Sequence, residues 1–144
     1  MTISVRRLVV TTALLLVGVT ASARAQAVET VTNVPFGFTA GDTNLPRDQY
    51  RVSPIPGQSG VFMIRGERHG VVLMSRIDRR NDRDPAPRLT FYRYGDQYFL
   101  REVQLGDGRI LQLSETRTER EAAESVGANA APKSKVIVAS RLPK

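Results

Sequence analysis

The chain has 144 residues and no cysteine, so one domain is expected and neither disulfide bonds nor thiolate metal sites can form. Its formal net charge is +7, but arginines and acidic residues are interleaved along the sequence instead of gathering in one basic run. A nucleic-acid-binding surface usually concentrates its positive charge on one face, so nucleic acid is not expected as a partner.

Residues 1–25 predict a secretory signal peptide. Arg6 and Arg7 precede an apolar run over residues 8–19, and small residues follow that run. This order of positive, apolar and small-residue regions directs export. The apolar run is shorter than the roughly 20 residues that a transmembrane helix needs.

Three Ala-x-Ala triplets offer cleavage positions, and they end at Ala23, Ala25 and Ala27. Cleavage after Ala25 is favoured. We therefore expect a bacterial periplasmic or secreted protein whose mature chain, residues 26–144, forms one β-rich domain without a transmembrane segment.

Strand signals fill the first half of the mature region. Residues 31–38 alternate in polarity and contain Pro35, which lacks an amide donor and therefore predicts an edge strand or a bulge. Residues 48–53 predict a second strand. Residues 61–65 and 71–77 are apolar almost throughout, which predicts a central hairpin buried on both faces.

The strongest structural signal is a hairpin over residues 89–105, which turns at Gly95-Asp96. A two-residue loop would pair Tyr94 with Gln97 and Phe91 with Leu100. A three-residue loop would instead gather the apolar residues more cleanly on one face, and that alternation favours the longer loop. A one-residue slip exchanges the two faces, so the two registers make opposite predictions.

The pattern changes towards the C-terminus. A polar loop is expected over residues 79–88, a short strand over 110–113, a helix near 115–125 and a last strand near 136–140. The fold class is therefore mainly β: a small antiparallel β-sandwich or β-barrel of about seven strands with one short peripheral helix. An open sheet with the helix on one face is the rival architecture.

Several motifs form a set that resembles an uncharacterised family of small secreted β-proteins from soil bacteria. The chain carries Asn33-Val-Pro-Phe-Gly-Phe38, Gly41-Asp42, Leu45-Pro46 and Tyr50-x-Val52, then the segment F-Y-R-Y-G-D-Q-Y-F-L over residues 91–100 and a Ser-x-x-x-x-Glu-Arg stretch ending at Arg120. Arg47-Asp48-Gln49 departs from relatives that place a glycine before the tyrosine. The resemblance implies a shared fold and export but no activity.

Catalytic chemistry has little support in the sequence. His69 is the only histidine and lies in a predicted turn, without a nucleophile or a set of metal donors beside it. Most acidic residues fall in turns or on the predicted helix, where turn and helix chemistry explain them. We predict no catalytic residue, no metal site and no cofactor, and an enzyme is the third-ranked hypothesis.

The best candidate surface is the aromatic cluster of the main hairpin, formed by Tyr92, Arg93, Tyr94 and Tyr98. Tyrosine and arginine are enriched at binding hot spots, although cross-strand support of the hairpin would explain them too. The sequence thus predicts an exported interaction module that binds an envelope or extracellular protein. The alternative is a small barrel that holds an apolar ligand in a cavity lined by Phe62, Met63, Leu73 and Met74.

Overall fold

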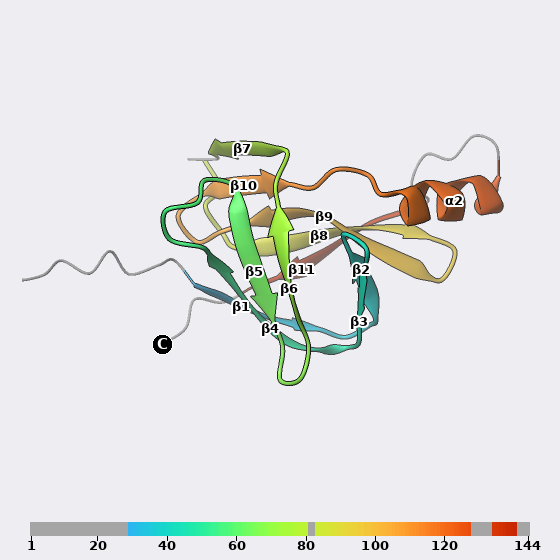
Figure 1. Ribbon diagram of the computed structural model, residues 1–144, viewed down its shortest axis with the longest axis horizontal. Helices are drawn as coiled ribbons and strands as arrows, with labels where there is room; N and C mark the ends of the chain where they lie inside the picture. Colours follow the sequence, from blue (N-terminus) through green and yellow to red (C-terminus); the bar gives the residue numbers. More distant parts are fainter. Residues whose placement is uncertain (1–28, 81–82, 128–133, 141–144) are drawn as a thin grey trace, which may run out of the picture.

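The computed structural model describes residues 29–80, 83–127 and 134–140. The predicted signal peptide lies outside these residues. The described chain forms two β-sheets that pack face to face, with one short helix at the periphery (Figure 1). The mainly β prediction and its sandwich form are confirmed, with eleven strands in the described residues where about seven were expected.

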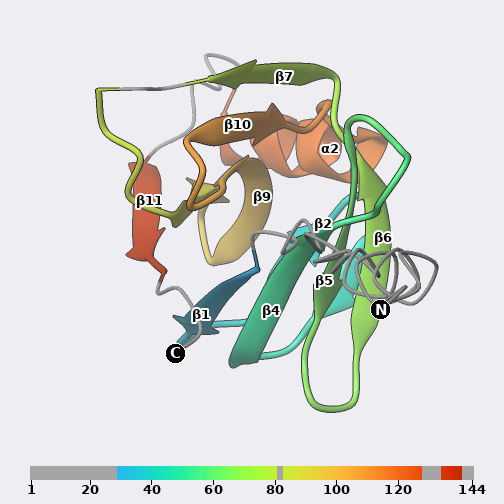
Figure 2. The same ribbon diagram turned by 90° about the vertical axis from the view of Figure 1, so that its left-hand side faces the viewer.

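The four-stranded sheet is antiparallel and has the strand order β1-β4-β5-β6 (Figure 2). Its strands are β1 (Thr30–Val34), β4 (Asp48–Pro54), β5 (Val61–Arg65) and β6 (Gly70–Met74). The single strand predicted over residues 31–38 is wrong: β1 ends at Val34, Pro35 lies outside it, and Phe38 begins β2 in the other sheet. β1 lies at an edge of its sheet.

The seven-stranded sheet has the order β11-β8-β9-β10-β7, with β2 beside β9 and β3 beside β2. Its strands are β2 (Phe38–Ala40), β3 (Thr43–Leu45), β7 (Ile77–Arg80), β8 (Arg88–Tyr94), β9 (Gln97–Gln104), β10 (Arg109–Gln112) and β11 (Ser134–Ala139). All pairings are antiparallel except the one between β2 and β9.

The core lies between the two sheets and is rich in aromatic contacts. The Phe38 ring meets both Tyr50 and Phe91 edge-on, at centroid distances of 5.2 Å and 5.1 Å. The Tyr50 hydroxyl donates to the carbonyl of Pro46 at 2.6 Å. Burial, together with the charge of Asp48, raises the pKa of Tyr50 to about 12, so this phenol stays neutral in the folded protein.

The prediction of a central hairpin buried on both faces is wrong for residues 71–77. The apolar run divides at Ser75-Arg76, where the amide of Ser75 still bonds to Gly60 but that of Arg76 bonds to Gln112 in the other sheet. β6 is therefore an edge strand of the four-stranded sheet, and β7 is an edge strand of the seven-stranded sheet. β7 also occupies the start of the predicted loop over residues 79–88.

A β-bulge resolves the two alternative registers of the main hairpin. At the turn, Tyr94 pairs with Gln97 and Phe91 with Leu100, so the two-residue loop is correct and the favoured three-residue loop is wrong. Gly95 adopts a φ of +59° there, as a hairpin turn beginning with glycine requires. Thr90 then pairs with Glu102, which leaves Arg101 as the extra residue and reverses the faces beyond it.

The helix predicted near residues 115–125 is α2 (Arg117–Val126). Thr116 caps it, because its hydroxyl accepts the amide of Glu119 at 3.2 Å. Its small residues Ala122 and Ala123 pack against Tyr94 and Phe99 on the outer face of the seven-stranded sheet.

Candidate functional site

The predicted aromatic cluster is divided between two faces of the hairpin. Tyr94 is buried beneath α2, and Tyr92 packs into the same cluster. Tyr98 lies on the opposite face, where it stacks on Phe36 at a centroid distance of 4.0 Å. Arg93 covers the Tyr98 ring at 5.5 Å. These four side chains therefore pack mainly within the fold and do not form one continuous surface.

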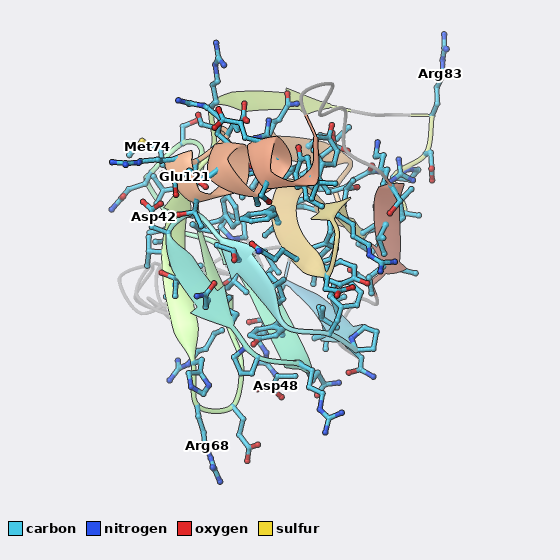
Figure 3. All side chains as sticks on the ribbon, turned by 90° about the vertical axis from the view of Figure 1, so that its right-hand side faces the viewer. Asp42, Asp48, Arg68, Met74, Arg83 and Glu121 are labelled. Carbon is cyan, nitrogen blue, oxygen red and sulfur yellow. The ribbon has the colours of Figure 1, made fainter. Side chains whose placement is uncertain are left out.

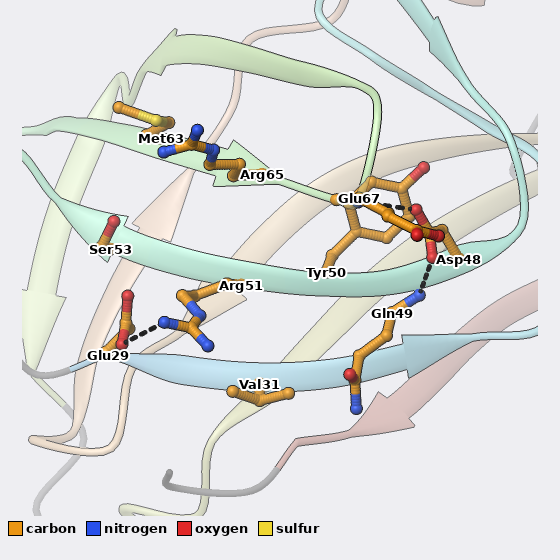
Figure 4. A pocket seen from close by; sticks show the side chains of 11 residues that line it. Glu29, Val31, Asp48, Gln49, Tyr50, Arg51, Ser53, Met63, Arg65 and Glu67 are labelled. Atoms are coloured by element: carbon orange, nitrogen blue, oxygen red, sulfur yellow. Dashed lines mark hydrogen bonds and ion pairs between the residues drawn. The ribbon is translucent and has the colours of Figure 1, made fainter.

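A groove of about 550 Å³ lies on the outer face of the four-stranded sheet (Figure 4). Alternate residues of β1, β4 and β5 line it, because every second side chain of a strand points away from the core. Its lining includes Val31, Gln49, Arg51, Ser53, Met63 and Arg65. The groove is thus a product of three neighbouring strands.

The two arginines of this groove differ in their ion pairs. Arg51 and Arg65 are directly opposite each other on β4 and β5. Arg51 forms an ion pair with Glu29 at 3.3 Å, whereas no carboxylate of the described residues pairs with Arg65. Like charges in this position destabilise a sheet.

The acidic residues nearby have other roles. Asp48 accepts the backbone amides of Gln49 and Glu67, at 2.7 Å and 2.9 Å, and so holds the turn after β5 (Figure 4). Neither Asp48 nor Glu67 forms an ion pair with Arg65.

An apolar strip, defined as Val61, Met63, Val72 and Met74, continues from the groove to the sheet edge. Val61 is opposite Met74, and Met63 is opposite Val72. Val72 is 56% exposed and Met74 is 74% exposed, and Met74 projects from the side of the molecule in Figure 3. A contiguous exposed apolar surface on a soluble protein commonly marks a binding site.

One polar cluster was not predicted from the sequence. Glu119 is only 2% exposed and accepts hydrogen bonds from Arg101 at 3.0 Å and from the Tyr94 hydroxyl at 3.4 Å. The bulge in β9 sets Arg101 apart from the strand register, and its guanidinium also lies 5.4 Å from the Tyr92 ring. Thr116 and Glu119 have the spacing of a capping box, as do Thr118 and Glu121, but this spacing does not show the inward direction of the Glu119 carboxylate.

Burial raises the pKa of Glu119, and the adjacent Arg101 partly opposes this effect. Burial and the charges of Glu119 and Glu115 raise the pKa of Tyr94. Because the Glu119 carboxylate is enclosed and already paired, it fixes α2 to the sheet and offers no opening to a substrate. We interpret the cluster as structural.

The remaining candidates are dispersed. His69 is exposed in the turn between β5 and β6, where its carbonyl accepts the amide of Gly66. Asp84 pairs with Arg88 in the loop before β8. Within the described residues, no three histidine or acidic side chains are grouped as a metal site would require.

Comparisons with protein-family models, curated proteins and solved structures found no match. No helix in the described part of the chain is both long and apolar enough to cross a membrane.

Proposed function

We propose that the protein is an exported, non-catalytic β-sandwich that binds another protein of the cell envelope or of the extracellular space. The observation that carries this proposal is the exposed apolar strip on the outer face of the four-stranded sheet, where Met74 is 74% exposed. The signal-like sequence of residues 1–25 supports export.

The positions of four apolar residues favour this function over transport of an apolar ligand. The alternative function, a barrel that holds an apolar ligand, requires a cavity lined by Phe62, Met63, Leu73 and Met74. Phe62 and Leu73 are buried in the core, whereas Met63 and Met74 lie in the strip on the outer face. The four side chains therefore do not line a common cavity, and the strip is the better candidate for binding.

Site-specific crosslinking in the periplasm tests the proposal. A photoreactive phenylalanine analogue in place of Met74 should give a discrete crosslinked product, and Val72→Lys in the same chain should abolish it. The analogue in place of Ile137 is the matched control, because Ile137 is an exposed apolar residue as well, at 56% exposure, but lies on β11. Equal crosslinking from positions 74 and 137, or a product insensitive to Val72→Lys, would contradict the proposal.

A further inference from the structure

The free edge of β6 presents backbone hydrogen-bonding groups. The amide of Ser75 bonds to the directly opposite Gly60, and that of Gly66 bonds to the opposite His69. Hydrogen-bonded pairs alternate along an antiparallel ladder, so Val71 and Leu73 bond to β5. The N–H and C=O groups of Gly70, Val72 and Met74 therefore point away from β5, where β6 has no second neighbour among the described strands.

This edge lacks the features that usually protect a sheet from further pairing. β6 contains no charged residue and no proline, and its outer face carries the exposed side chains of Val72 and Met74. An extended segment of another protein can form hydrogen bonds with the outward backbone groups of β6 and so add one strand to the sheet. The apolar side chains of that segment would then lie beside the strip.

An arginine, Arg65, lies beside the end of β6 at Gly70. Gly70 is opposite Arg65 and has no side chain, so nothing on β6 separates the Arg65 stem from the free edge. Arg65 has no acidic partner among the described residues, and the exposed Arg68 lies in the adjoining turn with Glu67. Because Glu29 is already paired with Arg51, the charge of Arg65 is available to a partner.

From this arrangement we propose that the partner contributes an extended peptide segment to the edge of β6, and that Arg65 binds an acidic side chain of that segment beside Gly70. The inference rests on the proposed function and gives the partner its chemistry: alternating apolar residues with an acidic residue at the end of the added strand. Arginine is suited to this role because its guanidinium forms charge-assisted hydrogen bonds with carboxylates.

Two other occupants fit less well. A second copy paired antiparallel and centred on Val72 would place Arg68 opposite Arg76 of that copy, and like charges in this position repel. An anionic membrane would leave the outward backbone groups of β6 without a strand partner.

Binding of labelled synthetic peptides to the mature protein tests this inference. The probe is a nine-residue peptide of alternating valine and threonine with glutamate at both ends, compared with versions that carry glutamine or lysine there. The glutamate peptide should bind about tenfold more tightly than the glutamine peptide. Arg65→Glu should make the lysine peptide bind more tightly than the glutamate peptide. Arg120→Glu, at an exposed position of α2, is the matched control and should leave the preference for glutamate unchanged.

Blocking the edge separates strand addition from simple charge attraction. Val72→Pro removes an outward amide without removing a bond to β5, so it should abolish binding while the thermal midpoint stays near that of the wild type. If this variant does not fold, Val72→Lys tests the same edge through its side chain.

Each contrary result overturns a defined part of the inference. Equal binding of the glutamate and glutamine peptides would overturn the role of Arg65 and leave docking at β6 intact. Absence of peptide binding, together with a crosslink from position 74, would overturn strand addition but not the proposed function. Binding to anionic vesicles without peptide binding would indicate a membrane, and a concentration-dependent dimer that Val72→Lys dissociates would indicate a second copy.

Discussion

Arg101 shows how one residue can determine both a strand register and a helix position. As the extra residue of the bulge, it shifts Val103 and Leu105 onto the core face with Leu89 and Phe91. Its side chain lies on the other face, where it pairs with Glu119 of α2. Its Nε atom is buried without a hydrogen-bond partner, so the contact with Glu119 is the main compensation for its burial.

We expect Arg101→Met to destabilise the protein by about 3 kcal/mol at neutral pH, because it leaves the buried Glu119 carboxylate without its cation. Burial raises the pKa of Glu119, so folding favours its protonated form, and the stability that Glu119 contributes falls as the pH rises through that raised pKa. Removing Arg101 raises this pKa further. The destabilisation by Arg101→Met should therefore be largest above that pKa, where Glu119 is ionised, and smaller at acidic pH, where Glu119 is protonated.

Urea denaturation at several pH values measures this effect. Arg93→Met is the matched control, because Arg93 forms an exposed ion pair with Asp96 at 3.4 Å, and its loss should cost less than about 1 kcal/mol. A destabilisation by Arg101→Met that is constant with pH would show that lost packing, and not the uncompensated carboxylate, is the cause.

At the scale of elements, sequence patterns located most strands but not their environments. The run over residues 61–65 matches β5, whereas the run over residues 71–77 is divided between β6 and β7. The apolar character of both runs predicts burial on both faces. β6 instead exposes Val72 and Met74. An exposed apolar edge and a buried central strand have the same composition, so a single sequence could not distinguish them.

The main hairpin has the same kind of ambiguity. Each of its two predicted registers describes one part of the strand pair, because the bulge joins two segments of opposite phase. The inward direction of Glu119 depends on where α2 packs, which a local pattern does not contain. The predicted binding tyrosines are another example. The sequence shows that tyrosines gather in this hairpin, but their distribution over its two faces follows from the pairing of β8 with β9.

The turn between β5 and β6 depends on a glycine. A Cβ atom at Gly66 would lie 2.7 Å from Asp48 Oδ2 and 2.8 Å from the ring of buried Tyr50. We expect Gly66→Ala to destabilise the protein by about 1–3 kcal/mol, because the core cannot readily make room. At Gly37 a Cβ atom would be 3.6 Å from its nearest neighbour, so Gly37→Ala should be nearly neutral. Thermal unfolding compares the two, and equal effects would contradict this explanation.

At the scale of the whole molecule, the two outer faces differ in character. α2 covers Tyr94 and Phe99 on the seven-stranded sheet through a buried ion pair and small residues. Among the described residues no helix lies on the outer face of the four-stranded sheet, where the groove and the apolar strip are found. This asymmetry supports binding by the four-stranded sheet and a structural role for the hairpin tyrosines.

The order of strands in the two sheets has a consequence for how the protein unfolds. The chain passes from one sheet to the other between β1 and β2, between β3 and β4, and between β6 and β7. Neither layer is a continuous segment, so neither can detach without exposing the core of the other. We therefore expect the two sheets to unfold as one cooperative unit. Hydrogen exchange should then measure the same free energy of opening for the slowest-exchanging amides of β5 and of β8. Two distinct values would instead indicate that the layers open separately.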